Sequence, residues 1–301
     1  MFRLLSKESN IFSVPVYIGV LLLIVISFNF LNFNTLELIS ALITFAGVAL
    51  GYFCFSAIAL NYHTHLPLFL YTVLIFALYP GNLDIGIAVS LFTNSIIILL
   101  LTNDNISVRN FSYTLVGSIL ALNFIFLPTT WPMAIFVVFH IIGTSDRIGL
   151  HIFRLFFGIL LVALSYLGLA YFLNMNSWNP AYFPFSGFKV QPHIDNLLWL
   201  SPVAILLIHS VMDHFRNFNK KSPNSRFKYT FLLVFSLAQL ITIVLYMGKT
   251  FEYLLLLALP TSIIISRMLR FSKKYWMQEV GLWVIIISLF IFKLSTYFNF
   301  F

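Results

Sequence analysis

Long apolar segments are the feature that most constrains how this chain can fold. A helix that crosses a lipid bilayer needs about 20 predominantly apolar residues, with a usual range of about 17–25. Because lipid offers no hydrogen bonds, the backbone of such a segment has to satisfy its own polar groups, as a helix does. The chain contains eleven candidate segments: Ile11–Phe30, Leu36–Leu60, Leu66–Tyr79, Ile85–Leu101, Phe111–Leu127, Pro132–Gly143, Ile152–Leu173, Leu197–Met212, Tyr229–Met247, Tyr253–Ser266 and Val280–Tyr297.

We therefore expect an all-α fold, a polytopic helical transmembrane bundle of about eleven spans that forms one integral membrane domain over residues 1–301. Two segments are short. Leu66–Tyr79 and Pro132–Gly143 would reach only about 21 and 18 Å, against a hydrocarbon core of about 30 Å. Each could extend into flanking polar residues or be a re-entrant element buried in protein. Losing both would leave nine spans and the same placement of the two chain ends.

The composition excludes most other classes of protein. Apolar residues make up 60% of the 301 positions and charged residues 9%, whereas a soluble domain has about 45–50% and about 25%. Seventeen cations and nine carboxylates are too few to cover the surface of a soluble globule of this length. Cys54 is the single cysteine, which rules out an intramolecular disulfide and a cysteine-based metal site.

The cations are distributed unevenly between the connections. If the N-terminus is inside, fourteen of the seventeen fall on one side: Arg3, Lys7, Arg109, Arg147, Arg154, Arg216, Lys220, Lys221, Arg226, Lys228, Arg267, Arg270, Lys273 and Lys274. The other side receives Lys189, Lys249 and Lys293. By the positive-inside rule the first side is cytoplasmic. We therefore expect a multi-pass protein of the bacterial inner membrane with a cytoplasmic N-terminus and a periplasmic C-terminus.

Two connections differ from the rest. Residues 174–196 form a long aromatic and proline-rich outer loop, which could be an interfacial lid or part of a substrate site. Residues 213–228 form a basic cytoplasmic loop, for which attraction to anionic headgroups is a sufficient explanation. Since topology accounts for the net charge of +8, we expect membrane lipids and envelope proteins as partners, and no nucleic acid. Gly117 and Ala121, four residues apart in the segment Phe111–Leu127, predict that this span packs closely on another helix through small residues.

Four residues on the outer side are candidates for catalysis: Glu37, Asp84, Lys249 and Glu252. In a membrane enzyme that handles lipid-linked sugars, a carboxylate would act as the base and a cation would hold the phosphate. Their spacing matches no established motif. The alternative is structural, with Lys249 and Glu252 pairing at the entrance of a helix.

Four residues on the inner side are candidates for binding a metal: His140, His209, Asp213 and His214. His209 and Asp213 are four residues apart, so they lie on one helix face and could share a ligand. No repeated histidine box accompanies them. The more economical interpretation is polar residues at helix ends, and we predict neither a metal nor any other cofactor.

The C-terminal third carries a family resemblance. The run Leu256-Leu257-Ala258-Leu259-Pro260-Thr261-Ser262-Ile263 is followed by Lys273-Lys274-Tyr275-Trp276-Met277-Gln278-Glu279 and an apolar last segment. This pattern resembles a domain-of-unknown-function family of polytopic inner-membrane proteins of about 300 residues from Bacteroidota. The resemblance implies a fold type and an envelope location, without a mechanism. It draws attention to Pro260, Trp276 and Glu279.

Three functions remain open at the level of sequence. The first is a non-catalytic component of cell-envelope assembly or transport that works with partner proteins. The second is a membrane enzyme for a lipid-linked or lipophilic substrate, through glycan transfer or polymerisation or through a histidine-metal oxygenase. The third is a small-molecule transporter. Ionisable residues within the apolar segments are scarce, which argues against transport driven by protons or sodium.

Overall fold

The helices of the protein follow the apolar segments. A computed structural model describes residues 1–9, 12–29, 35–58, 64–81, 83–175, 182, 196–247, 251–272 and 274–297. Apart from an isolated β-bridge between Glu8 and Thr64, the regular elements of these ranges are helical: α1 (Phe2–Leu5), α2 (Ser13–Asn29), α3 (Thr35–Ile58), α4 (His65–Leu78), α5 (Ile85–Leu101), α6 (Ile106–Phe126), η1 (Pro128–Thr130), α7 (Trp131–Thr144), α8 (Ile148–Phe172), η4 (Asn196–Leu200), α9 (Ser201–Arg216), η5 (Phe218–Lys220), α10 (Pro223–Tyr246), η6 (Glu252–Leu257), α11 (Ala258–Phe271) and α12 (Tyr275–Tyr297).

The predicted all-α fold is confirmed for these ranges, and each predicted apolar segment coincides with one of the helices α2 to α12. Several helices run past the apolar stretch, because backbone hydrogen bonding continues where the side chains become polar. α10, for example, begins at Pro223, six residues before the predicted segment. The proline is favourable at this position since its missing N–H would have no partner in the first turn.

Six helical stretches are long and apolar enough to cross a membrane: Thr35–Ser56, Ile148–Phe172, Asn196–Arg216, Pro223–Tyr246, Glu252–Phe271 and Tyr275–Thr296. Four further apolar helices are shorter: Ser13–Asn29, His65–Leu78, Ile85–Leu101 and Pro128–Thr144. Two of the long stretches combine a 3-10 turn with an α-helix, as in η6 and α11. The length and composition of these helices are those of a membrane protein.

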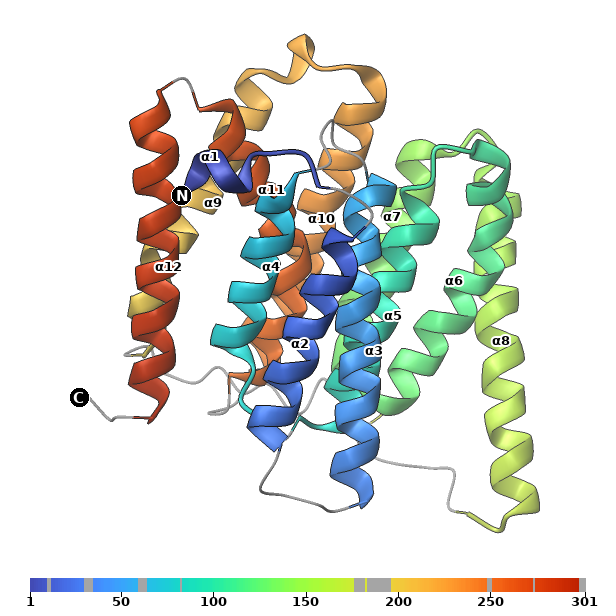
Figure 1. The fold of residues 1–301 in the computed structure, drawn as a ribbon. Coiled ribbons are helices and arrows are strands. Elements are labelled where there is room, and N and C mark those ends of the chain that lie inside the picture. Colours follow the sequence, from blue (N-terminus) through green and yellow to red (C-terminus); the bar gives the residue numbers. More distant parts are fainter. Residues whose placement is uncertain are drawn as a thin grey trace.

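The two short segments have different surroundings. α4 contacts α2, α3, α11 and α12 and lies inside the bundle in Figure 1. Nine of its fourteen residues are buried, so most of its surface meets protein. α7 is preceded directly by η1, and this turn lengthens the helical run to Pro128–Thr144. The surface of α4 is therefore mostly covered by protein, and α7 is extended at its start by η1.

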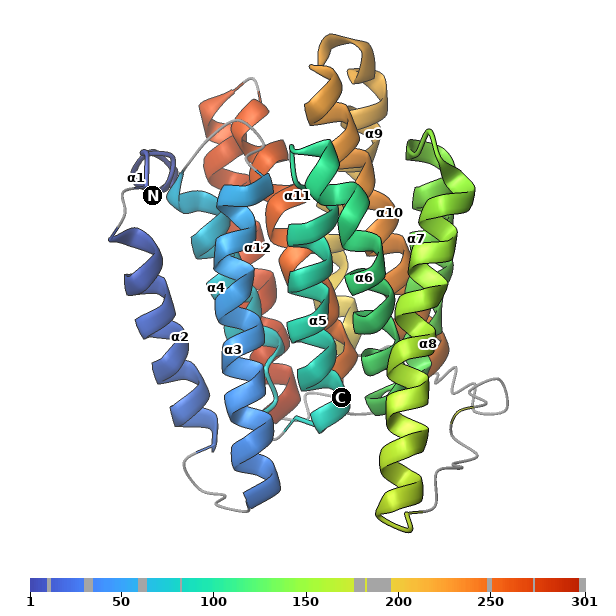
Figure 2. The same ribbon diagram turned by 90° about the vertical axis from the view of Figure 1, so that its right-hand side faces the viewer.

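The helices run up and down between two ends of the bundle, as Figures 1 and 2 show. One end carries α1, the connections at residues 102–105, 145–147 and 217–222, and residues 272 and 274. We call it the basic end, because thirteen described cations lie on its connections or on the adjoining helix turns. The opposite end carries residues 79–81, 83–84, 127–130 and 173–175 and the start of η6.

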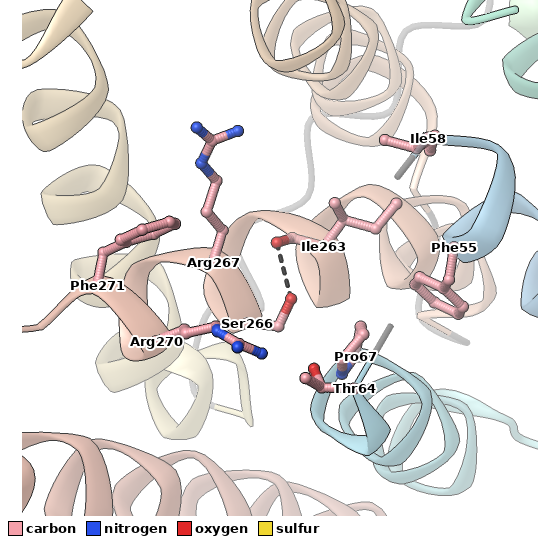
Figure 3. A pocket seen from close by; sticks show the side chains of 9 residues that line it. All are labelled: Phe55, Ile58, Thr64, Pro67, Ile263, Ser266, Arg267, Arg270 and Phe271. Atoms are coloured by element: carbon pink, nitrogen blue, oxygen red, sulfur yellow. Dashed lines mark hydrogen bonds between the residues drawn. The ribbon is translucent and has the colours of Figure 1, made fainter. Parts of the chain in front are cut away.

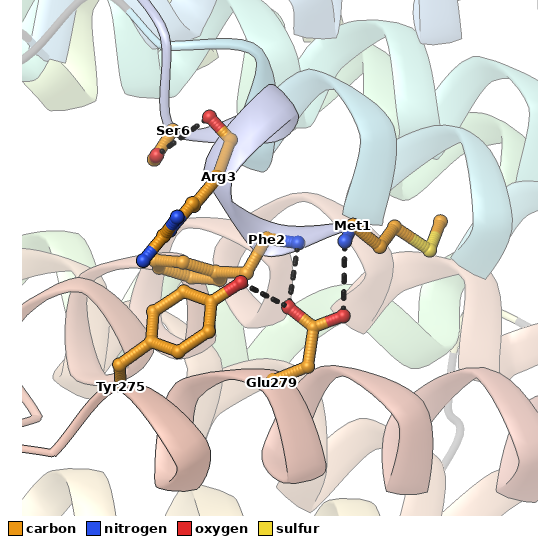
Figure 4. Close-up of polar contacts among 6 residues, drawn as sticks. All are labelled: Met1, Phe2, Arg3, Ser6, Tyr275 and Glu279. Carbon is orange, nitrogen blue, oxygen red and sulfur yellow. Dashed lines mark hydrogen bonds and ion pairs between the residues drawn. The ribbon is translucent and has the colours of Figure 1, made fainter.

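Helix α1 is held to the first turns of α12 by the carboxylate of Glu279 (Figure 4). One carboxylate oxygen accepts from the amino group of Met1 at 3.0 Å, and the other from the backbone N–H of Phe2 at 2.8 Å. Tyr275 adds a hydrogen bond to Glu279 at 3.2 Å, and the Arg3 guanidinium lies 4.9 Å from the Tyr275 ring centroid. Glu279, which the family resemblance highlights, therefore joins the N-terminal helix to the start of α12.

Helices α6 and α8 pack closely at two glycines. A Cβ atom on Gly117 would lie 2.1 Å from the backbone oxygen of Leu155, and one on Gly158 would lie 2.0 Å from that of Thr114. Ser118 Oγ also donates to the carbonyl of Gly158 at 3.2 Å. The glycines therefore allow the two backbones to touch. The close contact predicted at Gly117 is present, and its counterpart is Gly158.

We predict that Gly158→Ala destabilises the protein whereas Gly168→Ala does not. The added methyl group would clash with the α6 backbone at position 158, an overpacking that costs about 1–3 kcal/mol. Gly168 lies on the same helix, and no atom lies within 4 Å of the place that a methyl carbon would take there, so alanine should be neutral or slightly stabilising. Thermal unfolding in detergent measures both variants, and equal shifts would contradict the packing argument.

Candidate functional site

A cavity of about 680 Å³ opens at the basic end between α9, α10, α11 and α12. Its walls carry four cations and a single carboxylate: Lys220, Lys221, Arg267, Lys274 and Asp213. His209 lines the same cavity, one turn before Asp213 on α9. The cavity is therefore rich in hydrogen-bond donors with positive charge, a combination suited to an anionic group.

Arg267 is the most buried of these cations. It lies on α11, one turn before that helix ends, and 9% of its surface is exposed. Its Nη2 donates to Ser225 Oγ of α10 at 2.8 Å, and its guanidinium carbon lies 4.9 Å from the Tyr229 ring centroid. Its Nη1 has no hydrogen-bond partner among the described residues. A buried guanidinium thus keeps one unused donor group beside the cavity.

A smaller cavity of about 40 Å³ lies on another side of α11, and Arg267 borders both. Figure 3 draws the lining of the smaller cavity, in which Arg270 points toward Thr64 and Pro67, whereas the Arg267 guanidinium extends away from these two residues. The direction of Arg267 agrees with its hydrogen bond to Ser225, which lines the larger cavity. Arg267 is therefore directed toward the larger cavity.

Buried hydroxyl groups form the inner wall. Ser210 of α9 and Tyr229 of α10 are each 2% exposed, and their oxygens are 2.6 Å apart. Ser210 Oγ also donates to the backbone carbonyl of Ile264 at 3.3 Å, so the shared proton of the pair comes from Tyr229. These bonds join α9, α10 and α11 behind the cations and fix the ring against which Arg267 packs.

His214 is held behind the cavity. Its ring stacks on Tyr229 with centroids 4.3 Å apart, and it is fully buried. Lys221 Nζ lies 3.1 Å from Nδ1, and Thr230 Oγ1 lies 3.3 Å from Nε2. A protonated lysine only donates, so Nδ1 accepts and Nε2 carries the hydrogen. Burial, followed by the nearby Arg267 charge, lowers the pKa of Lys221.

Four of the five cations of the basic segment 213–228 form two sets. Lys220 and Lys221 line the cavity. Arg226 instead donates to the backbone carbonyls of Lys221 and Asn219 at 2.7 and 3.0 Å, and Lys228 pairs with Asp104 at 2.7 Å. The hydrogen bonds from Lys228 and Asn224 lower the pKa of Asp104. The second set therefore holds the connection in place, and the first faces the cavity.

The structure brings together only some of the candidate metal ligands. His209 and Asp213 share the cavity wall, as their spacing predicts, and Asp213 accepts a hydrogen bond from Asn217 at 2.8 Å. His214 is engaged through both ring nitrogens. His140 is buried on α7 against Phe227 and Phe231. In the described part of the chain, no three His, Cys, Asp or Glu side chains gather closely enough to hold a metal ion.

Three of the outer candidates, Glu37, Asp84 and Glu252, lie at the opposite end and do not border the basic cavity. Glu37 is in the first turn of α3, and Asp84 caps α5 by accepting from the Gly86 N–H at 3.4 Å. Glu252 begins η6, which contacts α5. Lys249 lies outside the described residues, as does most of the outer loop 174–196.

Sequence reasoning missed the residues that organise the cavity, namely Arg267, Tyr229, Ser225 and Ser210. The sequence assigns Arg267 to topology, and the hydroxyls carry no motif. One signal was available: Arg267 and Arg270 are one turn apart, so Arg267 is set back from the helix end. Nothing in the sequence pairs Arg267 with Ser225, 42 residues earlier.

We predict that a cysteine at His209 reacts faster with an anionic than with a cationic methanethiosulfonate. The positive potential of the cavity should enrich the anionic reagent about tenfold, and high salt should reduce this preference. Met175→Cys at the opposite end is the matched control, and the unsubstituted chain measures background from the buried Cys54. Equal or faster reaction of the cationic reagent at position 209 would contradict a positive cavity.

Comparison with known proteins agrees with the family resemblance. No curated protein and no solved structure matches the chain. One family does match, over residues 1–298, and its description is a family of unknown function, DUF6427. The match covers nearly the whole chain, well beyond the C-terminal motif. The protein therefore belongs to the DUF6427 family.

Proposed function

We propose that this protein is an eleven-span protein of the bacterial inner membrane, and that it serves cell-envelope assembly or transport as a non-catalytic component beside partner proteins. The observation that carries the proposal is the separation of polar and apolar surface. Cations collect at the basic end of the bundle, while the flanks expose large apolar side chains, such as Phe153, Phe156 and Leu164 on α8. Such flanks suit lipid tails or an apolar partner.

The orientation follows from the same separation. The basic end carries thirteen described cations, and among the described residues Lys293 is the cation nearest the other end. By the positive-inside rule the basic end faces the cytoplasm. The N-terminus then lies inside and the C-terminus in the periplasm, after an odd number of spans.

The arrangement of titratable groups supports a non-catalytic role. General acid–base or nucleophilic catalysis needs a base within reach of a reacting group. Behind the basic cavity, the ring nitrogens of His214 are engaged by Lys221 and Thr230, and in the cavity wall Asp213 accepts a hydrogen bond from Asn217. Lys293 is also engaged, since its ammonium donates to the Tyr79 carbonyl and lies 4.2 Å from the Phe28 ring centroid. These groups have structural roles.

A membrane enzyme for a lipid-linked substrate is the second candidate. The cavity favours it, because its cations could hold the phosphate of such a substrate. His209 would then be the available base, since it lines the cavity and is exposed. Loss of a measured turnover in a His209→Gln variant that still binds substrate would favour the enzyme over the non-catalytic component.

We predict that Met175→Cys reacts with an impermeant maleimide in intact spheroplasts, whereas Ser222→Cys reacts only after the membrane is permeabilised. Both positions are exposed, and Ser222 makes no side-chain cap bond that cysteine would remove. The unsubstituted chain is the control, because Cys54 is fully buried. The reverse pattern would overturn the orientation.

We also predict that gentle purification from native membranes recovers a defined complex. Cross-linking before solubilisation and mass measurement of the intact particle would identify stoichiometric envelope proteins bound to the chain. A monomer that carries lipid alone, under conditions that preserve a known membrane complex from the same cells, would contradict a component that works with partners.

A further inference from the structure

We propose that the basic cavity between α9, α10, α11 and α12 binds a phosphate group, with Arg267 as its central ligand. The cavity has room for more than an ion, at about 680 Å³, and its charged walls come from separate stretches of the chain. Lys220 and Lys221 lie before α10, Arg267 on α11 and Lys274 before α12. Folding thus gathers the cations around one space.

Arg267 distinguishes this cavity from a general surplus of cytoplasmic cations. A cation that serves only to orient the chain in the membrane needs to lie near water and headgroups, whereas only 9% of the surface of Arg267 is exposed. A buried charge is costly unless it is paired and hydrogen-bonded. No described carboxylate lies within ion-pair distance of its guanidinium, and Nη1 lacks a partner among the described residues. An anion in the cavity would satisfy both the charge and the donor.

The number of cations around the cavity favours a phosphate over a singly charged carboxylate. A guanidinium offers a planar fork of N–H groups that fits two oxygens of a phosphate, and lysine ammonium groups can hold the remaining oxygens and charge. Lys221 is placed for this role, since its ammonium is 5.3 Å from the Tyr229 ring centroid and Arg267 packs on the same ring. A singly charged carboxylate would leave most of these cations without a partner.

The surroundings also accommodate a lipid. Met268, Phe271 and Met277 give the cavity an apolar side. A neighbouring cavity of about 110 Å³ shares these three residues and continues toward Leu206 and Gly281. An amphiphile could therefore place its phosphate at Arg267 and its apolar part along α9 and α12. A free phosphate would use the cations alone, and the chemistry recognised is the same.

The inference is tested by titrating the full chain in phosphatidylcholine nanodiscs with dihexanoyl phosphatidate, inorganic phosphate and acetate. We expect phosphatidate to bind, acetate to bind at least tenfold more weakly, and Arg267→Gln to lower phosphatidate affinity about ten- to a hundredfold. Arg267→Lys, which retains the charge and loses the fork, should be intermediate. Binding of inorganic phosphate with similar affinity would assign a free anion as the source, and binding of phosphatidate alone a lipid headgroup.

Variants of exposed cations at the cavity rim provide a second test in case the Arg267 variants fail to fold. Lys220→Gln combined with Lys274→Gln changes two exposed side chains of the cavity, and Lys7→Gln changes an exposed cation of the same end outside it. We expect the double variant to bind phosphatidate at least fivefold more weakly, and Lys7→Gln to bind within twofold of the unsubstituted protein. The proposal would be overturned if neither phosphatidate nor inorganic phosphate bound, or if acetate bound as tightly as phosphatidate. Equal losses of phosphatidate affinity in the double variant and in Lys7→Gln would also overturn it. None of these results depends on the identity of protein partners.

Discussion

In an apolar environment every backbone N–H and C=O group needs a partner within the protein, and this requirement shapes the whole molecule. A helix meets it within one segment, so the apolar stretches become helices. Helix ends cannot meet it fully, and they therefore collect polar connections and capping residues such as Asp84. The cations gather at one set of ends, and the basic cavity lies among four of those ends, from α9 to α12.

The order of the apolar helices α2 to α12 could be predicted from the sequence because apolar length is a local property, whereas the four-residue helix α1 was not predicted. Their ends were less predictable, since hydrogen bonding continues through polar turns, as at Pro223. The location of α4 could not be predicted at all. Its apolar composition suits lipid as well as protein, and only its contacts with α11 and α12 place it inside the bundle.

In the candidate site, too, local relations could be predicted from the sequence and contacts between helices could not. The i, i+4 relation of His209 and Asp213 is local, and both line one cavity. Arg267 depends on residues of another helix: Ser225 accepts its hydrogen bond and Tyr229 supplies the ring beneath it. Such pairings arise from helix packing and leave no mark in the spacing of one sequence. Lys249 could not be placed, because it lies outside the described residues.

The short, enclosed helix α4 has a consequence for biogenesis. At 14 residues it measures about 21 Å, so it is a weak span by itself. Its partners α11 and α12 are synthesised almost two hundred residues later. Until they emerge, α4 has to rest in a locally thinned bilayer or beside α2 and α3. The contacts that enclose α4 therefore form only after α11 and α12 have been inserted.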